Sequence, residues 1–138
     1  MLVGFAIVAG ALVMLSGGWP SSTGVGGRID GPLLVAGGEQ PTQFAALVGG
    51  PLTVVDDCLL VGNHPTIWPP GTTWDDGRVR LADGRTFALG ATVTGGGGWV
   101  DASAIGGMFS STLAAVAGRC SPDGEVRVLH TVLPEDGS

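Results

Sequence analysis

The residues of this chain that could do chemistry are few and widely spaced. Its only cysteines are Cys58 and Cys120, and its only histidines are His64 and His130. Neither histidine stands at a zinc-motif spacing from a cysteine, and a catalytic Cys–His pair would need a free thiol. We therefore expect no metal and no cofactor. In an oxidising compartment the cysteines would form one structural disulfide, closing a loop of about sixty residues and contributing about 4 kcal/mol.

Trp68 and Trp74 lie close in sequence to an acidic pair, Asp75 and Asp76, and Trp99 follows the glycine run. One interpretation is an aromatic platform that binds a sugar or a peptide, with the carboxylates beside it. The alternative, which we favour, is that the indole rings fill the core of a small barrel and bond loop carbonyls through their N–H groups. The two aspartates, like Asp56 and Asp57, fit no recognisable calcium loop and are expected to be solvated turn residues.

No motif for hydrolysis or nucleotide binding is present. A Gly-x-Ser-x-Gly elbow is absent, and the glycines at 95–98 lack the Lys-Ser/Thr of a phosphate-binding loop. We expect those glycines to allow a sharp bend or a close backbone approach. His130 shares the alternation of the valines around it, which predicts a buried structural histidine, whereas His64 precedes a proline and is expected in an exposed loop.

The first fifteen residues contain no charged or hydrogen-bonding side chain. Residues 2–15 have the length of a signal-peptide core, and small residues follow at 16–18. Extended through Trp19, the stretch reaches roughly 27 Å as a helix, at the short end of what spans a bilayer. Residues 1–18 are thus expected to be a signal peptide or a membrane anchor; a buried core helix is the alternative. Residues 19–28, rich in glycine and serine, predict a flexible tether.

The remaining residues, 29–138, suffice for one domain. The net charge is −6, with twelve acidic residues against six arginines. Such a surface repels phosphate backbones, so nucleic-acid binding and polybasic membrane attachment are disfavoured. With 26 glycines and nine prolines, long regular helices are not expected.

Short strands dominate the predicted secondary structure. Asp-Gly pairs mark turns at Asp30, Asp76, Asp83, Asp123 and Asp136. Between 78 and 89, a three-residue loop at 82–84 with Gly84 left-handed would put Val79, Leu81, Phe87 and Leu89 on one face. The predicted strands are 33–36, 44–48, 52–61, 66–68, 78–82, 86–89 and 125–133.

One helix is predicted to interrupt the strands, at 101–118. Its apolar residues recur at helical spacing, with Asp101 or Ser103 as the cap and Gly118 at the end. The stripe consists of Ile105, Met108, Phe109, Leu113 and Val116. One helix among five to seven strands predicts a mainly β fold: a small closed or half-closed barrel, OB-like, with a sandwich as the alternative.

The segment from Cys58 to Gly98 contains a Trp-Pro-Pro-Gly-Thr stretch, an Asp-Gly hairpin and a glycine run, and Cys120 follows later. In these features the chain resembles a group of small uncharacterised exported proteins and lipoproteins of high-GC Gram-positive, actinobacterial, bacteria. It differs at the lipoprotein box, where Gly18 stands in place of the lipid-bearing cysteine. The resemblance implies an extracytoplasmic location and assigns no activity.

These observations favour a non-enzymatic exported domain of the cell envelope with a structural or interaction role. Its partner would be an envelope protein or a glycan, with contact to the membrane through residues 1–18 if they are retained. The alternative is a glycan- or small-ligand-binding module that uses Trp68, Trp74 and Trp99 with Asp75 and Asp76. An envelope hydrolase is the third hypothesis, and it requires a serine beside His64 or His130.

Overall fold

The computed structural model describes residues 25–38 and 46–133. Most of the signal or anchor and tether predictions therefore lie outside the described residues. Residues 25–28 of the predicted tether instead belong to the fold: the Val25 N–H donates to the Met108 carbonyl at 3.0 Å, and the first strand begins at Gly27. Within the described ranges, none of the helices combines the length and the apolar character needed to cross a membrane.

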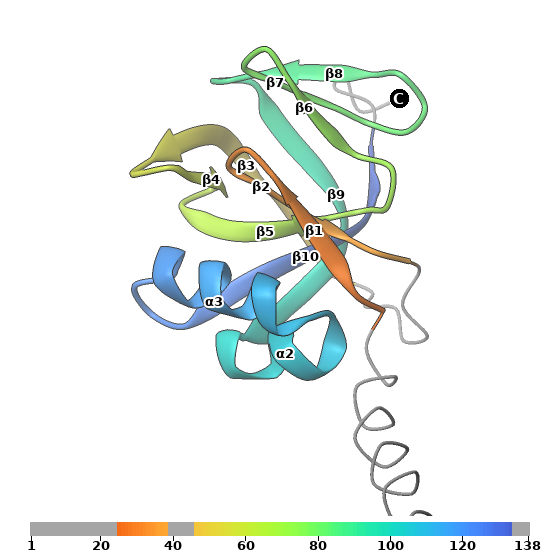
Figure 1. Ribbon diagram of the computed structural model, residues 1–138. Helices are drawn as coiled ribbons and strands as arrows, with labels where there is room; N and C mark the ends of the chain where they lie inside the picture. The colour runs from red at the N-terminus through yellow and green to blue at the C-terminus, as the bar shows by residue number, and fades with distance from the viewer. Residues whose placement is uncertain (1–24, 39–45, 134–138) are drawn as a thin grey trace, which may run out of the picture.

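Five strands close into a barrel (Figure 1). Going round it, the order is β3, β4, β5, β10, β9 and back to β3. All neighbours pair antiparallel except β5 and β10, which are parallel. The predicted class, a small OB-like β-barrel, is confirmed. The strands are β3 (Ala46–Val55), β4 (Cys58–Val61), β5 (His64–Trp68), β9 (Thr92–Asp101) and β10 (Glu125–Val132).

Two smaller sheet elements extend the barrel. β1 (Gly27–Asp30) and β2 (Leu33–Ala36) form a hairpin, and β2 runs parallel to β5. A separate three-stranded sheet follows β5, and its Val79, Leu81 and Phe87 join the core cluster of the barrel interior. Its strands are β6 (Thr73–Asp75), β7 (Arg78–Arg80) and β8 (Thr86–Ala88).

The helical segment is divided into pieces and packs outside the barrel (Figure 1). The single helix predicted at 101–118 is wrong in its bounds: a 3-10 turn, η2 (Ala102–Ala104), and α2 (Ile105–Met108) precede α3 (Ser111–Cys120). Ser110 interrupts the helix because its extended backbone and its hydroxyl, which accepts the Leu113 N–H at 3.2 Å, make it the α3 cap. Asp101 makes no side-chain cap bond.

Two hydrophobic cores lie on opposite faces of β5 and β10. The barrel interior contains Trp68 and Leu129, whereas Ile67 and Val128 pack outward against the helices. A register shift between Leu129 and Thr131 changes the alternation of β10. The prediction of a buried His130 fails for this reason, because His130 lies at the irregularity and is only half-buried.

The strand predicted at 52–61 is a hairpin, not one strand. β3 ends at Val55 and β4 begins at Cys58, with Asp56 and Asp57 forming the turn at φ 51° and 65°. Two aspartates can adopt these left-handed angles, but they are a weaker turn signal than Asp-Gly.

The hairpin at 78–89 forms with the predicted loop. Val79 pairs with Phe87, the Leu81 N–H donates to the Arg85 carbonyl, and Gly84 has φ 95°. Val79, Leu81 and Phe87 are buried as expected, but Leu89 is 46% exposed because β8 ends at Ala88.

The glycines at 95–98 form part of a central strand instead of a bend. They pair with β10 on one side, and Gly95–Gly97 pair with β3 on the other. A Cβ at Gly95 would overlap the Thr131 carbonyl, and one at Gly97 would overlap the Val128 carbonyl. The predicted close backbone approach is therefore present, inside β9.

Candidate functional site

The disulfide between Cys58 and Cys120 is formed, with 5.8 Å between the Cα atoms. It joins the first residue of β4 to the last residue of α3, and both cysteines are buried. The end of the helix is thereby fixed against the barrel wall. This confirms the predicted bridge and agrees with an oxidising environment.

The three tryptophans do not form one platform. Trp68 is fully buried in the barrel, and its indole N–H has no hydrogen-bond partner among the described residues. Trp99 is 49% exposed and lies under the guanidinium of Arg127, 5.8 Å from the ring centroid. Trp74 is half-buried and packs on the edge of the barrel core. Trp68 is thus out of reach of a ligand, and the other two line different depressions.

Asp75 and Asp76 lie at the β6–β7 turn. Asp75 accepts a hydrogen bond from Arg80 at 2.8 Å, and both partners are about half-exposed. Asp76 occupies the turn itself with φ 52°. The pair forms a solvated turn, and neither aspartate lines the groove that contains Trp74.

The outer face of β4 and β5 is covered by the chain itself. In OB folds the corresponding strands and the first loop commonly form the ligand surface. Here Leu60 packs with the disulfide and Val116, and Ile67 packs under Leu113 and Ala117. A ligand therefore cannot lie across the middle of this face.

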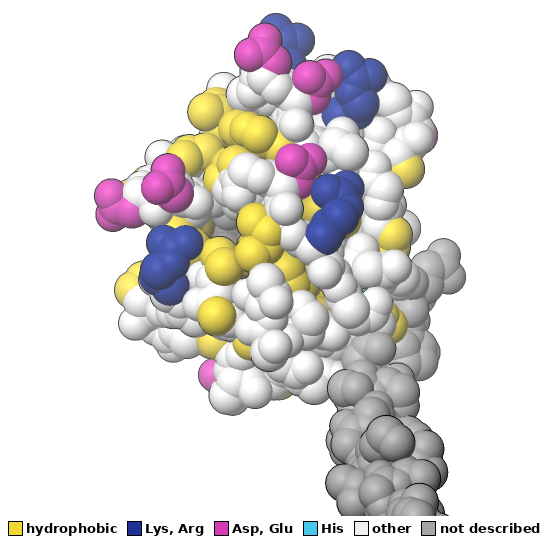
Figure 2. Space-filling model, in the orientation of Figure 1, with side chains coloured by type: hydrophobic (Ala, Val, Ile, Leu, Met, Phe, Trp, Pro, Cys, Tyr) yellow, Lys and Arg dark blue, Asp and Glu magenta, His cyan; other side chains and the backbone are white. Residues whose placement is uncertain are grey.

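A groove remains at the margin of the covered face, with a volume of about 510 Å³. It lies between the β1–β2 turn, the tip of the β3–β4 hairpin, β6 and α3. Figure 2 shows hydrophobic side chains grouped around a hollow on this side of the molecule, with acidic and basic side chains at its margins. Its apolar lining is Ile29, Pro32, Val54, Trp74 and Val116, and its charged lining is Asp57 and Arg119.

Local contacts position Trp74 in this groove. Its backbone N–H donates to the Asp30 carboxylate at 2.8 Å, which ties β6 to the β1–β2 turn. Gly31, with φ 62°, completes that turn, and a Cβ there would come within 2.8 Å of the indole ring. Glycine is thus required both by the backbone angle and by the ring.

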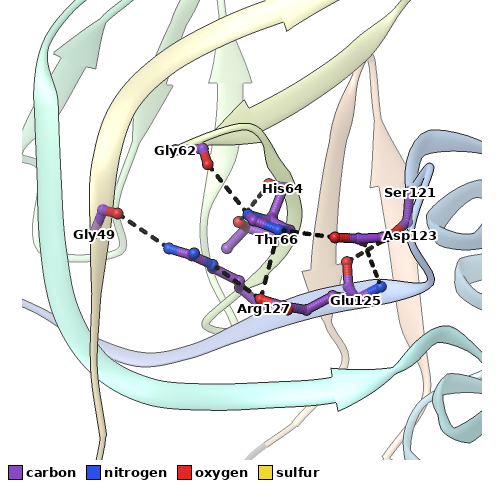
Figure 3. A network of polar contacts seen from close by, with 8 residues as sticks. All are labelled: Gly49, Gly62, His64, Thr66, Ser121, Asp123, Glu125 and Arg127. Carbon is purple, nitrogen blue, oxygen red and sulfur yellow. Dashed lines mark hydrogen bonds and ion pairs between the residues drawn. The ribbon is translucent and has the colours of Figure 1, made fainter.

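A polar network lies where β5 runs beside β10 (Figure 3). His64 is the first residue of β5, so the prediction of an exposed loop histidine is wrong; the residue is half-buried. Its Nε2 lies 3.6 Å from Asp123 Oδ2 and 3.6 Å from Glu125 Oε2. Its Nδ1 lies 3.2 Å from the carbonyl oxygen of Gly62.

Further polar contacts fix the two carboxylates of this network. Asp123 Oδ1 accepts the Glu125 N–H at 3.0 Å and lies 3.2 Å from the Ser121 hydroxyl. The Glu125 N–H, followed by the Ser121 hydroxyl and the charge of His64, holds the pKa of Asp123 below its ordinary value. Arg127 donates to the Gly49 carbonyl at 3.1 Å, and its Nε lies 3.8 Å from Glu125 Oε2.

Sequence reasoning missed this network because its members are far apart in the chain. His64 and Glu125 meet only through the parallel pairing of β5 with β10, in which Thr66 aligns with Arg127. The two-residue spacing of Asp123 and Glu125 after a helix was the only local signal.

The arrangement is not that of a serine hydrolase. The Ser121 hydroxyl lies 2.7 Å from the Glu125 carbonyl and 3.2 Å from the Asp123 carboxylate, so its partners are these oxygens and not the imidazole of His64. A nucleophilic serine instead donates to the histidine that takes its proton. Here the Ser121 hydroxyl contacts the Asp123 carboxylate, and that carboxylate in turn contacts the imidazole of His64. This order of contacts does not activate the serine.

A second, smaller depression of about 180 Å³ lies beside the Pro69-Pro70 corner. Arg85 and His130 line it, and Arg85 donates to the Val132 carbonyl at 2.8 Å. Burial lowers the pKa of the His130 imidazole.

Comparison with known proteins returns nothing for this chain: no family model, no curated protein and no solved structure matches it. Its strand order and the Cys58–Cys120 bridge define it as a small OB-like barrel with one disulfide.

Proposed function

We propose that this chain is a non-enzymatic interaction domain of the cell envelope that acts outside the cytoplasmic membrane. The Cys58–Cys120 disulfide supports an oxidising compartment. The uncharged stretch at 1–15 supports export, with residues 1–18 as a signal peptide or anchor. The same location is implied by the resemblance to exported actinobacterial proteins.

In this proposal the groove beside Trp74 is the binding surface, and its partly exposed apolar lining is the main support. Its walls come from four separate elements, and Ile29 and Val54 each remain 38% exposed there. Apolar side chains that converge on a hollow mark sites where a partner removes them from water. The disulfide adjoins this surface because it fixes the end of α3, which supplies Val116 and Arg119.

The occupant that fits is an extended peptide segment of an envelope protein with apolar side chains. Five of the lining residues are apolar, whereas Asp57 and Arg119 provide one acceptor and one donor of opposite charge. Such a lining matches a peptide, whose side chains are apolar and whose backbone is polar. The net charge of −6 disfavours polyanionic ligands.

A glycan is the second candidate. The specific observation is that an indole ring, a carboxylate and a guanidinium share one groove at Trp74, Asp57 and Arg119. An aromatic ring with polar groups beside it can hold a sugar ring.

The test uses two probes and a matched pair of variants. The probes are an array of ten-residue peptides with alternating apolar side chains and a tetramer of N-acetylglucosamine. Val54→Asp places a charge in the groove, and Val55→Asp places one on the next residue, which does not line it. Both valines are partly exposed on β3, at 38% and 53%, so both variants should fold.

We expect peptide binding, followed by tryptophan fluorescence, to weaken about tenfold or more in Val54→Asp and to stay unchanged in Val55→Asp. If the sugar binds and the peptides do not, the ligand class is a glycan and not a peptide. Failure of both probes, or equal loss in both variants, would overturn the groove as the binding surface.

A further inference from the structure

His64, Asp123 and Glu125 bring three ligand-type atoms to one point at the junction of β5 and β10, with all three atoms within 4.8 Å of one another. This site is separate from the groove and depends on none of its residues. We propose that it binds one divalent transition-metal ion, and that zinc is the ion that fits best.

The spacing of the three atoms suits a small tetrahedral ion. His64 Nε2 lies 3.6 Å from each of the two carboxylate oxygens. Zinc bonds of about 2.0–2.1 Å at the tetrahedral angle hold neighbouring ligand atoms roughly 3.3–3.4 Å apart. The imidazole nitrogen therefore needs to approach each carboxylate oxygen by only a few tenths of an ångström to coordinate an ion, and the two carboxylate oxygens lie within 4.8 Å of each other on the same side of the ring (Figure 3).

The hydrogen bond on the far side of the imidazole selects the ligating nitrogen. The carbonyl of Gly62 can only accept, so Nδ1 carries the proton that bridges their 3.2 Å separation. In the neutral ring, Nε2 then directs its lone pair at two carboxylate oxygens. Three electron-rich atoms in this arrangement repel one another unless a proton on Nε2 or a metal ion lies between them.

Two of the three ligands, His64 and Asp123, have hydrogen-bond partners that orient them. Gly62 orients His64, and the Ser121 hydroxyl and the Glu125 N–H engage Asp123 Oδ1, which leaves Asp123 Oδ2 to face the site. Arg127 lies beside Glu125 and is itself held by the Gly49 carbonyl. Bound metals in proteins have such outer partners, which fix the orientation of their ligands.

The donor set decides the class of ion. One imidazole and two carboxylates suit zinc and its transition-metal neighbours, whereas calcium and magnesium prefer oxygen ligands alone. Three protein ligands leave the fourth tetrahedral position for water or for a group from a partner. The Arg127 guanidinium offsets one of the two carboxylate charges, so a divalent ion has to be held by coordination geometry more than by net charge.

The test measures binding of zinc alone to the full chain, by competition with a chromophoric chelator. His64→Gln removes the nitrogen ligand, and Glu125→Gln removes one carboxylate at nearly constant size. The matched control is His130→Gln, because His130 is the other histidine and lies beside Pro69-Pro70. With both cysteines in the disulfide, thiols cannot account for the binding.

We expect one zinc ion per chain. Its affinity should fall about tenfold or more in His64→Gln and Glu125→Gln and stay unchanged in His130→Gln. Zinc should also raise the Tm of the parent chain and of His130→Gln, but not that of His64→Gln. Calcium and magnesium should not compete. The proposal is overturned if zinc does not bind stoichiometrically, since His64 would then contact the carboxylates only through a proton. It is also overturned if His130→Gln loses as much zinc affinity as His64→Gln.

Discussion

The two hydrophobic cores of this protein differ in how they are enclosed. The barrel interior is enclosed by five strands that pair in a closed ring, and it buries Trp68 completely. The helical layer covers only one outside face, and it is held by an apolar stripe and by one disulfide at Cys120. Both candidate sites border the helical layer: α3 contributes to the groove, and the turn after it contributes Asp123. We therefore expect the barrel to be the more stable part, and both candidate sites lie where the helical layer meets it.

The largest expected effect lies in the barrel. Trp68→Ala should lower the free energy of unfolding by about 3–5 kcal/mol, because it leaves a cavity in a fully enclosed core. Trp99→Ala is the matched control, since that ring is 49% exposed, and it should cost less than about 1 kcal/mol. Urea unfolding of both variants measures the difference; equal losses would contradict the enclosed packing of Trp68.

Removal of the disulfide should loosen the helical layer more than the barrel. Replacing Cys58 and Cys120 together by serine should cost about 4 kcal/mol in the chain-entropy model. Hydrogen exchange should accelerate first in α3 and the turn after it, while β9 and β10 stay protected. Uniform acceleration across all elements would contradict this division of roles.

A smaller effect should come from the α3 cap. The Ser110 hydroxyl accepts the Leu113 N–H, so Ser110→Ala should cost about 1 kcal/mol. Ser103→Ala changes an exposed serine in η2 and should have almost no effect. Thermal unfolding of the two variants checks the difference, and a loss in Ser103→Ala as large as in Ser110→Ala would refute the assignment of the cap.

The smallest expected effect is the pH response of His130. Burial lowers its pKa in the fold, so the unfolded chain binds a proton more readily and stability should fall as pH drops below about 6.5. His130→Gln should reduce that fall between pH 7.5 and 5. Asp123 does not interfere, because a carboxylate with a lowered pKa loses its contribution only as pH falls below about 3.8. Urea midpoints at three pH values test this; identical slopes in both chains would contradict it.

Local patterns in the sequence predicted local structure well. The loop at 82–84 follows from Asp-Gly and from the alternation of Val79, Leu81 and Phe87, all within one hairpin. The disulfide follows from two cysteines and an uncharged apolar stretch at 1–15. These features need only neighbouring residues or simple counting.

Long-range features escaped prediction for a physical reason. Glycine has low strand propensity, so residues 95–98 do not look like a strand; they form one by pairing with β10 and β3, and glycine is required at Gly95 and Gly97 because the β10 backbone approaches too closely for a Cβ. The His64 network requires the parallel pairing of β5 and β10, and the groove requires four elements to meet at Trp74. None of these contacts leaves a periodic signal in the chain.

The most direct test of an extracytoplasmic domain with a fixed helical layer is the state of Cys58 and Cys120 in the producing cell. Thiols are alkylated before lysis, and the intact mass of the chain is measured with and without prior reduction. We expect no alkylation of the unreduced chain and two adducts after reduction, because both thiols are joined in the disulfide. Two adducts on the unreduced chain, recovered from the cytosol, would contradict it.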